Sequence, residues 1–484
     1  HLRTRRQRQM CIRDRYDISS YTGMLDANEE SFGIRKLPYY DFSKAKTVVS
    51  FGYDFLGSSF NHNLFNKQFT SQRVVNREKR EMSRLYTFES NLSLTGANSD
   101  HRIPIRTSHS KIYIAELWNI LNSKIGSSRD YINYNKSKKS IINLDMLNKA
   151  ADDLIKNLGS SLVISSSNDK STQSVVIMIN ELLRSYGKTI DLNKCYNIRK
   201  GDDNKMVQFV SDLEKKSVHG VIFLNSNPVY NHYLSSRIRK GLDSVPLKIS
   251  TSDRIDETSV LCDVIAPDSH FLESWNDYEP IDNHFSFGQP TIRRIFDTRQ
   301  SQDTFLKWID YEENYFSLLK NNWRKKQKLL KSNEPFQIFW DSLLHDGVAE
   351  IVDKNLKNRN PLPNSYKNRI SEVNKISTLI DRESNNENFE LNLYHNMTVS
   401  DGIQSNNPWL QEMPDPISKV CWDNYISINP KDANKLSVKT DVGTMTTNLL
   451  LLKSEQESYE IPVIIQPGQA EGCLLYTSDA ADES

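Results

Sequence analysis

Cysteine is scarce in this 484-residue sequence, which contains five, and none of them belongs to a C-x2-C pair. Iron–sulfur and zinc sites need closely spaced thiolates, usually with at least one such pair. The three interior cysteines, Cys195, Cys262 and Cys421, lie far apart in the sequence and are predicted to be buried or inert thiols. We therefore expect no metal site within this sequence.

Long hydrophobic runs are missing as well. Among the longest are Val175 to Ile179 and Leu449 to Leu452, far short of the roughly 20 apolar residues that cross a bilayer, so no direct membrane span is predicted. With 62 basic and 61 acidic residues the formal net charge is +1, which gives no reason to expect nucleic acid as a partner. P-loop, G-x-G-x-x-G, G-x-S-x-G and H-E-x-x-H motifs are absent.

The two ends carry no hydrophobic periodicity. Residues 1–15 hold six Arg and no apolar signal-peptide core follows them, while residues 473–484 read CLLYTSDAADES. Both resemble translated sequencing adapters. We expect neither end to contribute to the fold, and residues 16–472 to be an internal piece of a longer protein.

The interior alternates between helix and strand patterns, which is typical of parallel α/β sheets. We predict an α/β domain at 16–143, with a buried strand at Thr47–Phe51, and a second α/β domain at 144–388. The second includes a helical insertion, with an apolar stripe running from Phe305 through Trp308 and Ile309 to Leu319. It also includes a polar crossing at 355–388 that is either extended or poorly ordered. Strand patterns separated by Pro and Gly turns predict a β-rich domain at 389–472.

Candidate ligand-binding residues follow the predicted strands, because ligands of parallel sheets lie beyond the carboxyl ends of the strands. Asn225, Asn227 and Pro228 come directly after a strand at 220–224. Here the backbone N–H groups of a helix N-terminus could meet a phosphate, or the segment could be an ordinary strand-to-helix turn with Pro in the first helical turn. His270 either lines a pocket or lies at a capped helix start.

A further candidate region contains Trp409, Trp422 and Asn424. Two tryptophans near polar residues could stack on a ligand, but a packed surface of the β-rich domain is the commoner arrangement, and we expect it here.

Seven segments in order resemble the molybdopterin oxidoreductase superfamily and, more narrowly, the large iron–sulfur subunit of alternative complex III. They are YTGMLDANEESFG (21–33), VVSFGYDFLGS (48–58), FESNLSLTGANSDHR (88–102), GVIFLNSNPVYN (220–231), HFLESWNDYEP (270–280), FGQPTIRRIFDTRQSQDTFLKW (287–308) and NPWLQEMPDPISKVCWDN (407–424). The resemblance implies Rossmann-like parallel-sheet domains of the molybdopterin-oxidoreductase type. It also implies that residues 389–472, which end in IIQPGQAEG (464–472), form a β-barrel-like domain of the kind that binds molybdopterin dinucleotides.

The narrower resemblance implies a subunit on the periplasmic side of the inner membrane, in a respiratory complex that oxidises quinol. Its partners would be membrane and cytochrome c-type subunits, and its 4Fe-4S clusters would lie in a C-terminal half that is absent from this sequence. The present half is thought to hold no molybdenum. In agreement, Asn225 stands where active relatives typically have Gly, and a bulkier side chain would crowd a pyrophosphate.

An alternative is a catalytic molybdopterin-dependent oxidoreductase of the DMSO reductase superfamily. In that case Asn225, Asn227, Pro228 and His270, together with Trp422 and Asn424, would line the cleft for molybdopterin guanine dinucleotide.

Overall fold

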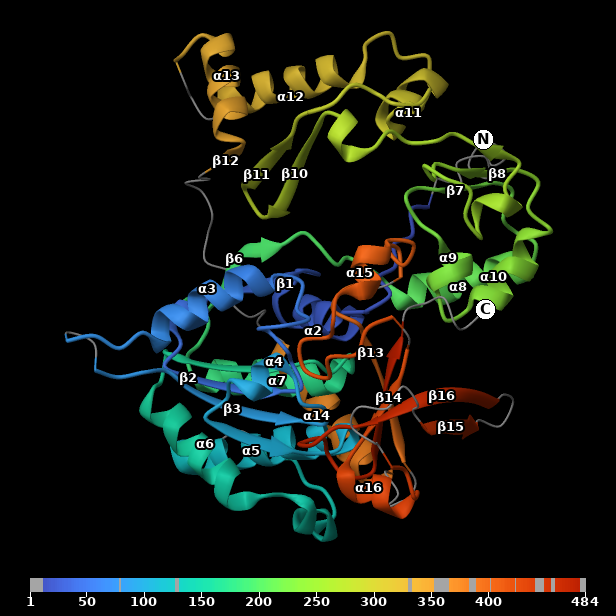
Figure 1. The fold of residues 1–484 in the computed structure, drawn as a ribbon. Coiled ribbons are helices and arrows are strands. Elements are labelled where there is room, and N and C mark those ends of the chain that lie inside the picture. The colour runs from blue at the N-terminus through green and yellow to red at the C-terminus, as the bar shows by residue number, and fades with distance from the viewer. Residues whose placement is uncertain are drawn as a thin grey trace, which may run out of the picture. The chain divides into compact units, whose positions relative to one another are not determined.

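The computed structural model describes residues 12–77, 80–126, 130–329, 333–351, 365–382, 389–400, 402–422, 424–439, 448–453 and 458–478. Its chain forms two compact units (Figure 1). The main unit consists of Gly23–Cys195 and Lys357–Glu483, and the insertion unit consists of Tyr196–Leu356 together with residues up to Thr22. The insertion unit therefore interrupts the sequence of the main unit.

A four-stranded parallel sheet lies at the centre of the main unit. Its strands are β2 (Thr47–Phe51), β3 (Arg84–Glu89), β4 (His101–Pro104) and β5 (Ser161–Ser165), in the order β4-β3-β2-β5. Every residue of β2 and β5 is buried, as expected of parallel strands covered on both faces. The strand predicted at 47–51 is confirmed, but β5 pairs with β2, so this sheet extends beyond the boundary that we placed after residue 143.

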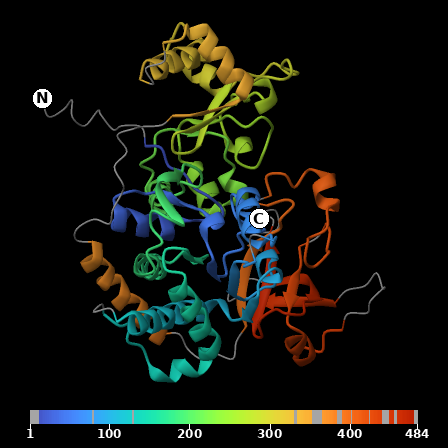
Figure 2. The same ribbon diagram turned by 90° about the vertical axis from the view of Figure 1, so that its left-hand side faces the viewer.

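Helices pack around this sheet, and their apolar side chains form the largest hydrophobic core of the chain. They are α5 (Ser110–Ile125), α6 (Leu144–Lys156), α7 (Lys170–Leu182) and α14 (Ser365–Arg382). Helix α14 packs on α7 (Figure 2), and Ile376 and Ile380 are fully buried. The prediction of an extended or poorly ordered crossing at 355–388 is therefore wrong for 365–382. The prediction rested on the polar composition of the segment. It overlooked the spacing of the two isoleucines, which lie one helical turn apart.

The α/β part of the main unit contains further helices and strands. They are α2 (Thr22–Phe32), β1 (Leu37–Tyr40), α3 (His62–Arg73), α4 (Leu94–Ala97) and β6 (Ile190–Tyr196). None of the described helices is long and apolar enough to cross a membrane.

The C-terminal part of the main unit is a mixed sheet in the order β13-β17-β14-β16-β15. Its strands are β13 (Glu390–His395), β14 (Ile426–Ile428), β15 (Asn448–Lys453), β16 (Ser458–Ile465) and β17 (Cys473–Ser478), with short helices α15 (Pro408–Glu412) and α16 (Pro430–Lys435). The β-rich character predicted for 389–472 is confirmed.

Strand β17 corrects the exclusion of residues 473–484 from the fold. It lies parallel to β13 and antiparallel to β14, and Leu475 is buried. The apolar run CLLYT has the composition of a strand. Its resemblance to an adapter sequence led to its exclusion from the predicted fold. Residues 479–484 lie outside the described residues, as do residues 1–11, and the adapter origin of both ends stays a prediction.

The insertion unit contains a three-stranded parallel sheet, β7-β8-β9. Its strands are β7 (Val221–Phe223), β8 (Lys248–Ser250) and β9 (Val264–Ile265), and its helices are α8 (Asp203–Glu214), α9 (Pro228–Asn231) and α10 (Ser235–Leu242). Phe223 packs with apolar residues of α8 and α10 in a separate small core.

The same unit holds an antiparallel hairpin with a third strand and three helices. They are β10 (Asn276–Ile281), β11 (His284–Gly288), β12 (Val348–Glu350), α11 (Ser301–Trp308), α12 (Tyr315–Leu329) and α13 (Phe336–Asp346). Trp323, Trp340 and Leu319 are buried in its core. The predicted apolar stripe is wrong at Trp308 and Ile309, which are exposed. The helix ends there, and Asp310 turns the chain with a φ of 52°.

Candidate functional site

The carboxyl ends of β7, β8 and β9 meet at one edge of the parallel sheet. We call the residues that follow them the strand-end site, namely 225–228 after β7, 251–257 after β8 and 268–270 after β9. The strands are parallel and in register, so their following residues share this edge. Four of the six predicted site residues, Asn225, Asn227, Pro228 and His270, belong to it.

Asn225 adopts a left-handed backbone conformation, with a φ of 46°. Glycine is the usual residue in this region, and Asn is one of the few others that tolerate it. The Asn225 N–H donates to Thr251 Oγ1 at 3.3 Å, and its side-chain amide lies 3.5 Å from Asp268 Oδ2. The side chain therefore spans from the end of β7 to the loop after β9.

Asn227 and Pro228 form a strand-to-helix turn that is closed by the loop after β8. The Asn227 side chain donates to Glu257 Oε2 at 2.7 Å and accepts from the hydroxyl of Thr258 at 2.6 Å. Pro228 has no N–H, and the Val229 N–H donates to Thr258 Oγ1 at 3.1 Å. The N–H groups of the next two residues, Tyr230 and Asn231, bond the Asn227 carbonyl.

Asp268 ties the strand-end site to the start of α11. Its carboxylate accepts from the Ser301 N–H at 2.8 Å and from the Ser301 hydroxyl at 2.5 Å. The Asp268 N–H donates to the carbonyl of Thr251, a residue that is itself fully buried. These contacts hold the three loops of the site together.

His270 is an exposed residue at the N-cap of a short 3-10 helix, Phe271–Glu273. Its Nδ1 accepts from the Leu272 N–H at 3.3 Å, and its own N–H donates to Glu273 at 3.2 Å. This is the capped start that we weighed against a pocket wall. Nearby, the hydrogen bond from Arg254 lowers the pKa of Asp253, and His270 adds a smaller effect in the same direction.

Trp422 and Asn424 belong to the main unit and are not part of the strand-end site. Trp422 has a φ of 73°, and its N–H donates to the Gln411 carbonyl at 2.9 Å. Its exposed fraction is 54%, and that of Trp409 is 80%. The packed arrangement expected for this region is therefore wrong, because both indoles face solvent.

The described cysteines, Cys195, Cys262, Cys421 and Cys473, are all free thiols. Cys262 lies 3.4 Å from the Thr258 carbonyl, and burial raises its pKa to about 11. Burial raises the pKa of Cys473 to about 12. Metal ligation requires a thiolate, and no group of three metal-ligating side chains occurs among the described residues.

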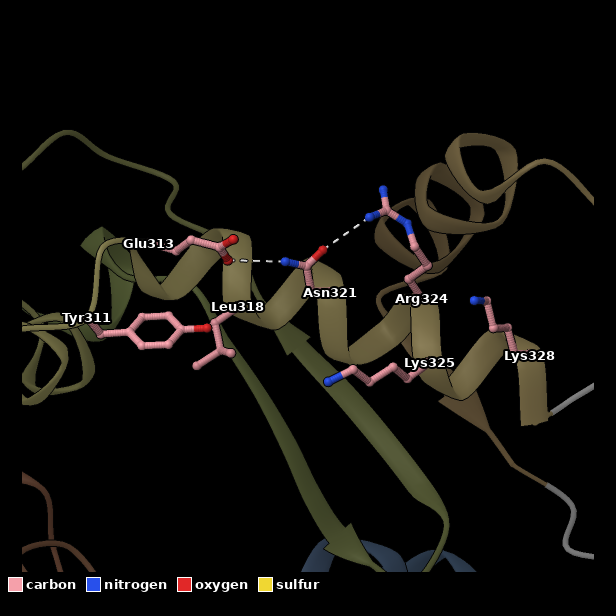
Figure 3. A pocket seen from close by; sticks show the side chains of 7 residues that line it. All are labelled: Tyr311, Glu313, Leu318, Asn321, Arg324, Lys325 and Lys328. Atoms are coloured by element: carbon pink, nitrogen blue, oxygen red, sulfur yellow. Dashed lines mark hydrogen bonds between the residues drawn. The ribbon is translucent and has the colours of Figure 1, made fainter.

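A hollow of about 280 Å³ lies along α12 (Figure 3). It is lined by Tyr311, Glu313, Leu318, Asn321, Arg324, Lys325 and Lys328. Asn321 bonds both Glu313 and Arg324 at 3.1 Å. The lining comes from one helix and its preceding turn and contains no group of catalytic side chains held by a second element, so it does not make a preorganised catalytic site.

The strand-end residues do not fit a pterin dinucleotide as they are arranged. A pyrophosphate needs free N–H donors close to the backbone, but those at the start of α9 are bonded within the chain. The Asn225 side chain occupies the approach, and the carboxylates of Asp268 and Glu257 would repel a phosphate. Sequence reasoning identified Asn225 and Asn227 but missed their partners Thr251, Glu257, Thr258 and Asp268.

No family model matches the sequence. A stretch of 101 residues is 28% identical to the menaquinone reductase, molybdopterin-binding-like subunit of Nitratidesulfovibrio vulgaris, and it makes up 20% of this chain and 15% of that subunit. This match therefore covers only a small part of the relative.

Among solved structures, acetylene hydratase from Pelobacter acetylenicus superposes with a TM-score of 0.55 at 11% sequence identity. The match covers 96% of this chain and 74% of the hydratase. The chain therefore has the fold of the molybdopterin oxidoreductases, the superfamily that its sequence resembles.

Proposed function

We propose that this chain is the molybdopterin-oxidoreductase-like half of an iron–sulfur subunit in a quinol-oxidising respiratory complex of the alternative complex III type. It serves as a scaffold and holds no molybdenum cofactor of its own. The fold and the similarity to a subunit named menaquinone reductase, molybdopterin-binding-like, support this proposal.

The observation that carries the proposal is the self-contained hydrogen bonding of the strand-end site. Asn227 is paired with Glu257 and Thr258, and Asp268 is paired with Ser301. A cofactor would have to break these bonds and leave the buried hydroxyls of Thr258 and Ser301 without partners, at a cost of about 1–3 kcal/mol for each group. A chain that keeps the fold but pairs these groups internally is suited to a structural role.

The rest of the proposal follows the resemblance. Iron–sulfur clusters would be held by a part of the protein outside this sequence. Membrane and cytochrome c-type subunits would be its neighbours, on the periplasmic side of the inner membrane. In this arrangement electrons would pass beside this half of the subunit rather than through a metal centre within it.

The test is metal and pterin analysis of the complete protein, purified from its host within its native complex. We expect iron in stoichiometric amount, with molybdenum and tungsten below one-tenth of an atom per chain and no pterin released by acid oxidation. One molybdenum per chain together with pterin would contradict the scaffold role and support the catalytic alternative. A control purification of a known molybdenum enzyme from the same cells would show that the host supplies the cofactor.

A further inference from the structure

An exposed loop of the insertion unit combines apolar side chains with three exposed arginines. We call residues 289–300 the Arg-rich loop; it connects β11 to α11 (Figure 1) and has no regular secondary structure. The exposed fractions are 69% for Ile295 and 75% for Phe296, and Phe271, in the 3-10 helix beside the loop, is 66% exposed. Soluble proteins rarely leave several large apolar side chains together in water unless a partner covers them.

The loop backbone is fixed although its side chains are exposed. The N–H groups of Thr291 and Ile292 donate to the Leu272 carbonyl at 2.8 and 3.2 Å. The Ile295 N–H donates to Glu273 Oε1 at 3.0 Å, and the Arg299 N–H donates to the Pro267 carbonyl at 3.2 Å. A surface held in this way loses little conformational entropy on binding, which favours affinity.

The charge of the loop is unbalanced. Arg293, Arg294 and Arg299 are exposed. Within the described part of the chain none of them forms an ion pair, and the Arg294 guanidinium donates to the Thr298 carbonyl at 2.5 Å. The nearby Glu273 carboxylate is occupied by the backbone N–H groups of His270 and Ile295, which leaves Asp297 as the acidic residue of the loop. Arginine next to exposed aromatic and aliphatic side chains is the composition of protein interface hot spots.

We propose that the Arg-rich loop, with Phe271, is a docking surface for another protein subunit whose contact face is apolar and rimmed with carboxylates. The proposal rests on the proposed function, in that it assigns a surface to a subunit contact of the complex. A protein fits better than a membrane surface because the carboxylates of Asp297 and Glu273 are interleaved with the arginines, and anionic lipid would repel them. The loop is also rigid, which suits a shaped partner.

The test uses the full chain, tagged and purified from its host under mild conditions. The variant Arg293→Glu/Arg294→Glu should reduce the co-purified partner subunit at least tenfold, because two attractive contacts become repulsive. The matched control is Lys325→Glu/Lys328→Glu on α12, which makes the same charge change at exposed positions of the same unit. The control should retain the partner, and thermal unfolding should be the same in both variants.

A second measurement is hydroxyl-radical footprinting of Phe271 and Phe296 in the purified complex and in the isolated chain. We expect protection of at least fivefold in the complex only. Protection already present in the isolated chain would show that this chain covers the surface itself, and would overturn the proposal. Retention of the partner by the Arg293→Glu/Arg294→Glu variant, or equal loss in the control, would also overturn it.

The lipid alternative is tested with phosphatidylglycerol vesicles. Vesicle binding by the wild type that is lost in the arginine variant would assign the surface to a membrane and overturn the protein partner. If the wild-type chain itself purifies without any other subunit, the proposed function fails, and the docking proposal fails with it. If the proposed function is right and only the docking surface is wrong, the wild type still co-purifies with its partner, and the arginine variant retains that partner too.

Discussion

His109 shows how the burial of one side chain sets a pH dependence in the main unit. It follows β4 and faces Glu390, Arg106 and Lys138. Burial lowers the pKa of His109 below its ordinary value, Glu390 opposes this shift, and the two cations add to it. In the unfolded chain the imidazole has its ordinary pKa of about 6.5 and takes up a proton more readily than in the folded chain. Protonation therefore favours the unfolded state, and the free energy of unfolding falls as the pH drops below about 6.5.

We therefore expect the free energy of unfolding of the wild type to fall between pH 7.5 and 5.5, and His109→Gln to show a smaller fall. Urea denaturation at the two pH values measures both. His345→Gln is the control, because the side chain of His345 is almost fully exposed. An identical pH dependence in the wild type and His109→Gln would contradict the assignment.

Asn225 and its hydrogen-bond partners illustrate how much of the candidate site could be predicted from the sequence. The replacement of Gly by Asn after a predicted strand was visible, and the crowding that it causes follows from the size of the side chain. Its partner Asp268 lies 43 positions away, and Glu257 lies 30 positions from Asn227. Local patterns carry no information on such pairings, so the closure of the site by its own residues was not predictable.

Helix α14 supplies the clearest test at the scale of elements. Ile376 is fully buried in the core that surrounds the parallel sheet. Ile376→Ala should lower the free energy of unfolding by about 3 kcal/mol, because it removes apolar contacts and leaves a cavity. Chemical denaturation measures the change. Thr378→Ala, at an exposed position of the same helix, should change stability by less than about 0.5 kcal/mol.

A small effect of Ile376→Ala, equal to that of Thr378→Ala, would show that α14 does not pack as described. The contrast with β2 explains why one element was predicted and the other was not. The β-branched run at 47–51 is buried on both faces and reads as a strand without knowledge of its neighbours. Helix α14 has a polar surface, and its few apolar positions become informative only when α7 is known to cover them.

Arg102 joins the two parts of the main unit at the scale of the whole molecule. Its guanidinium bonds Glu89 in β3, the Asn91 carbonyl, and the Gly468 carbonyl in the loop after β16, with the last distance at 2.6 Å. Glu89 is buried, and burial raises its pKa although Arg102 and Ser93 oppose this. The Arg102 side chain thus connects the α/β part with the C-terminal sheet.

Arg102→Met should lower the free energy of unfolding by about 3 kcal/mol, because it leaves a buried carboxylate without its partner. The double variant Glu89→Gln/Arg102→Met should recover part of this loss. Thermal unfolding measures stability, and limited proteolysis at 466–472 measures loosening of the loop. If the losses in the single variants Glu89→Gln and Arg102→Met simply add up in the double variant, the direct interaction is contradicted.

Domain organisation at this scale could be predicted only in part. The order of α/β and β-rich regions follows from sequence periodicity. The interruption of the main unit by the insertion unit does not, because it is seen only when α14, which follows the insertion, packs on α7, which precedes it. Compact units are defined by contacts between distant segments, which a boundary drawn along the sequence cannot represent.

The pairing of β13 with β17 has a consequence for the order of biosynthesis. Glu390 pairs with Cys473, and the whole of β13 finds its partner about 80 residues later in the chain. During synthesis at typical elongation rates, β13 therefore has no β17 to pair with for several seconds. During that interval its unpaired N–H and C=O groups are open to pairing with other chains. Chaperones that engage this region would act within that interval.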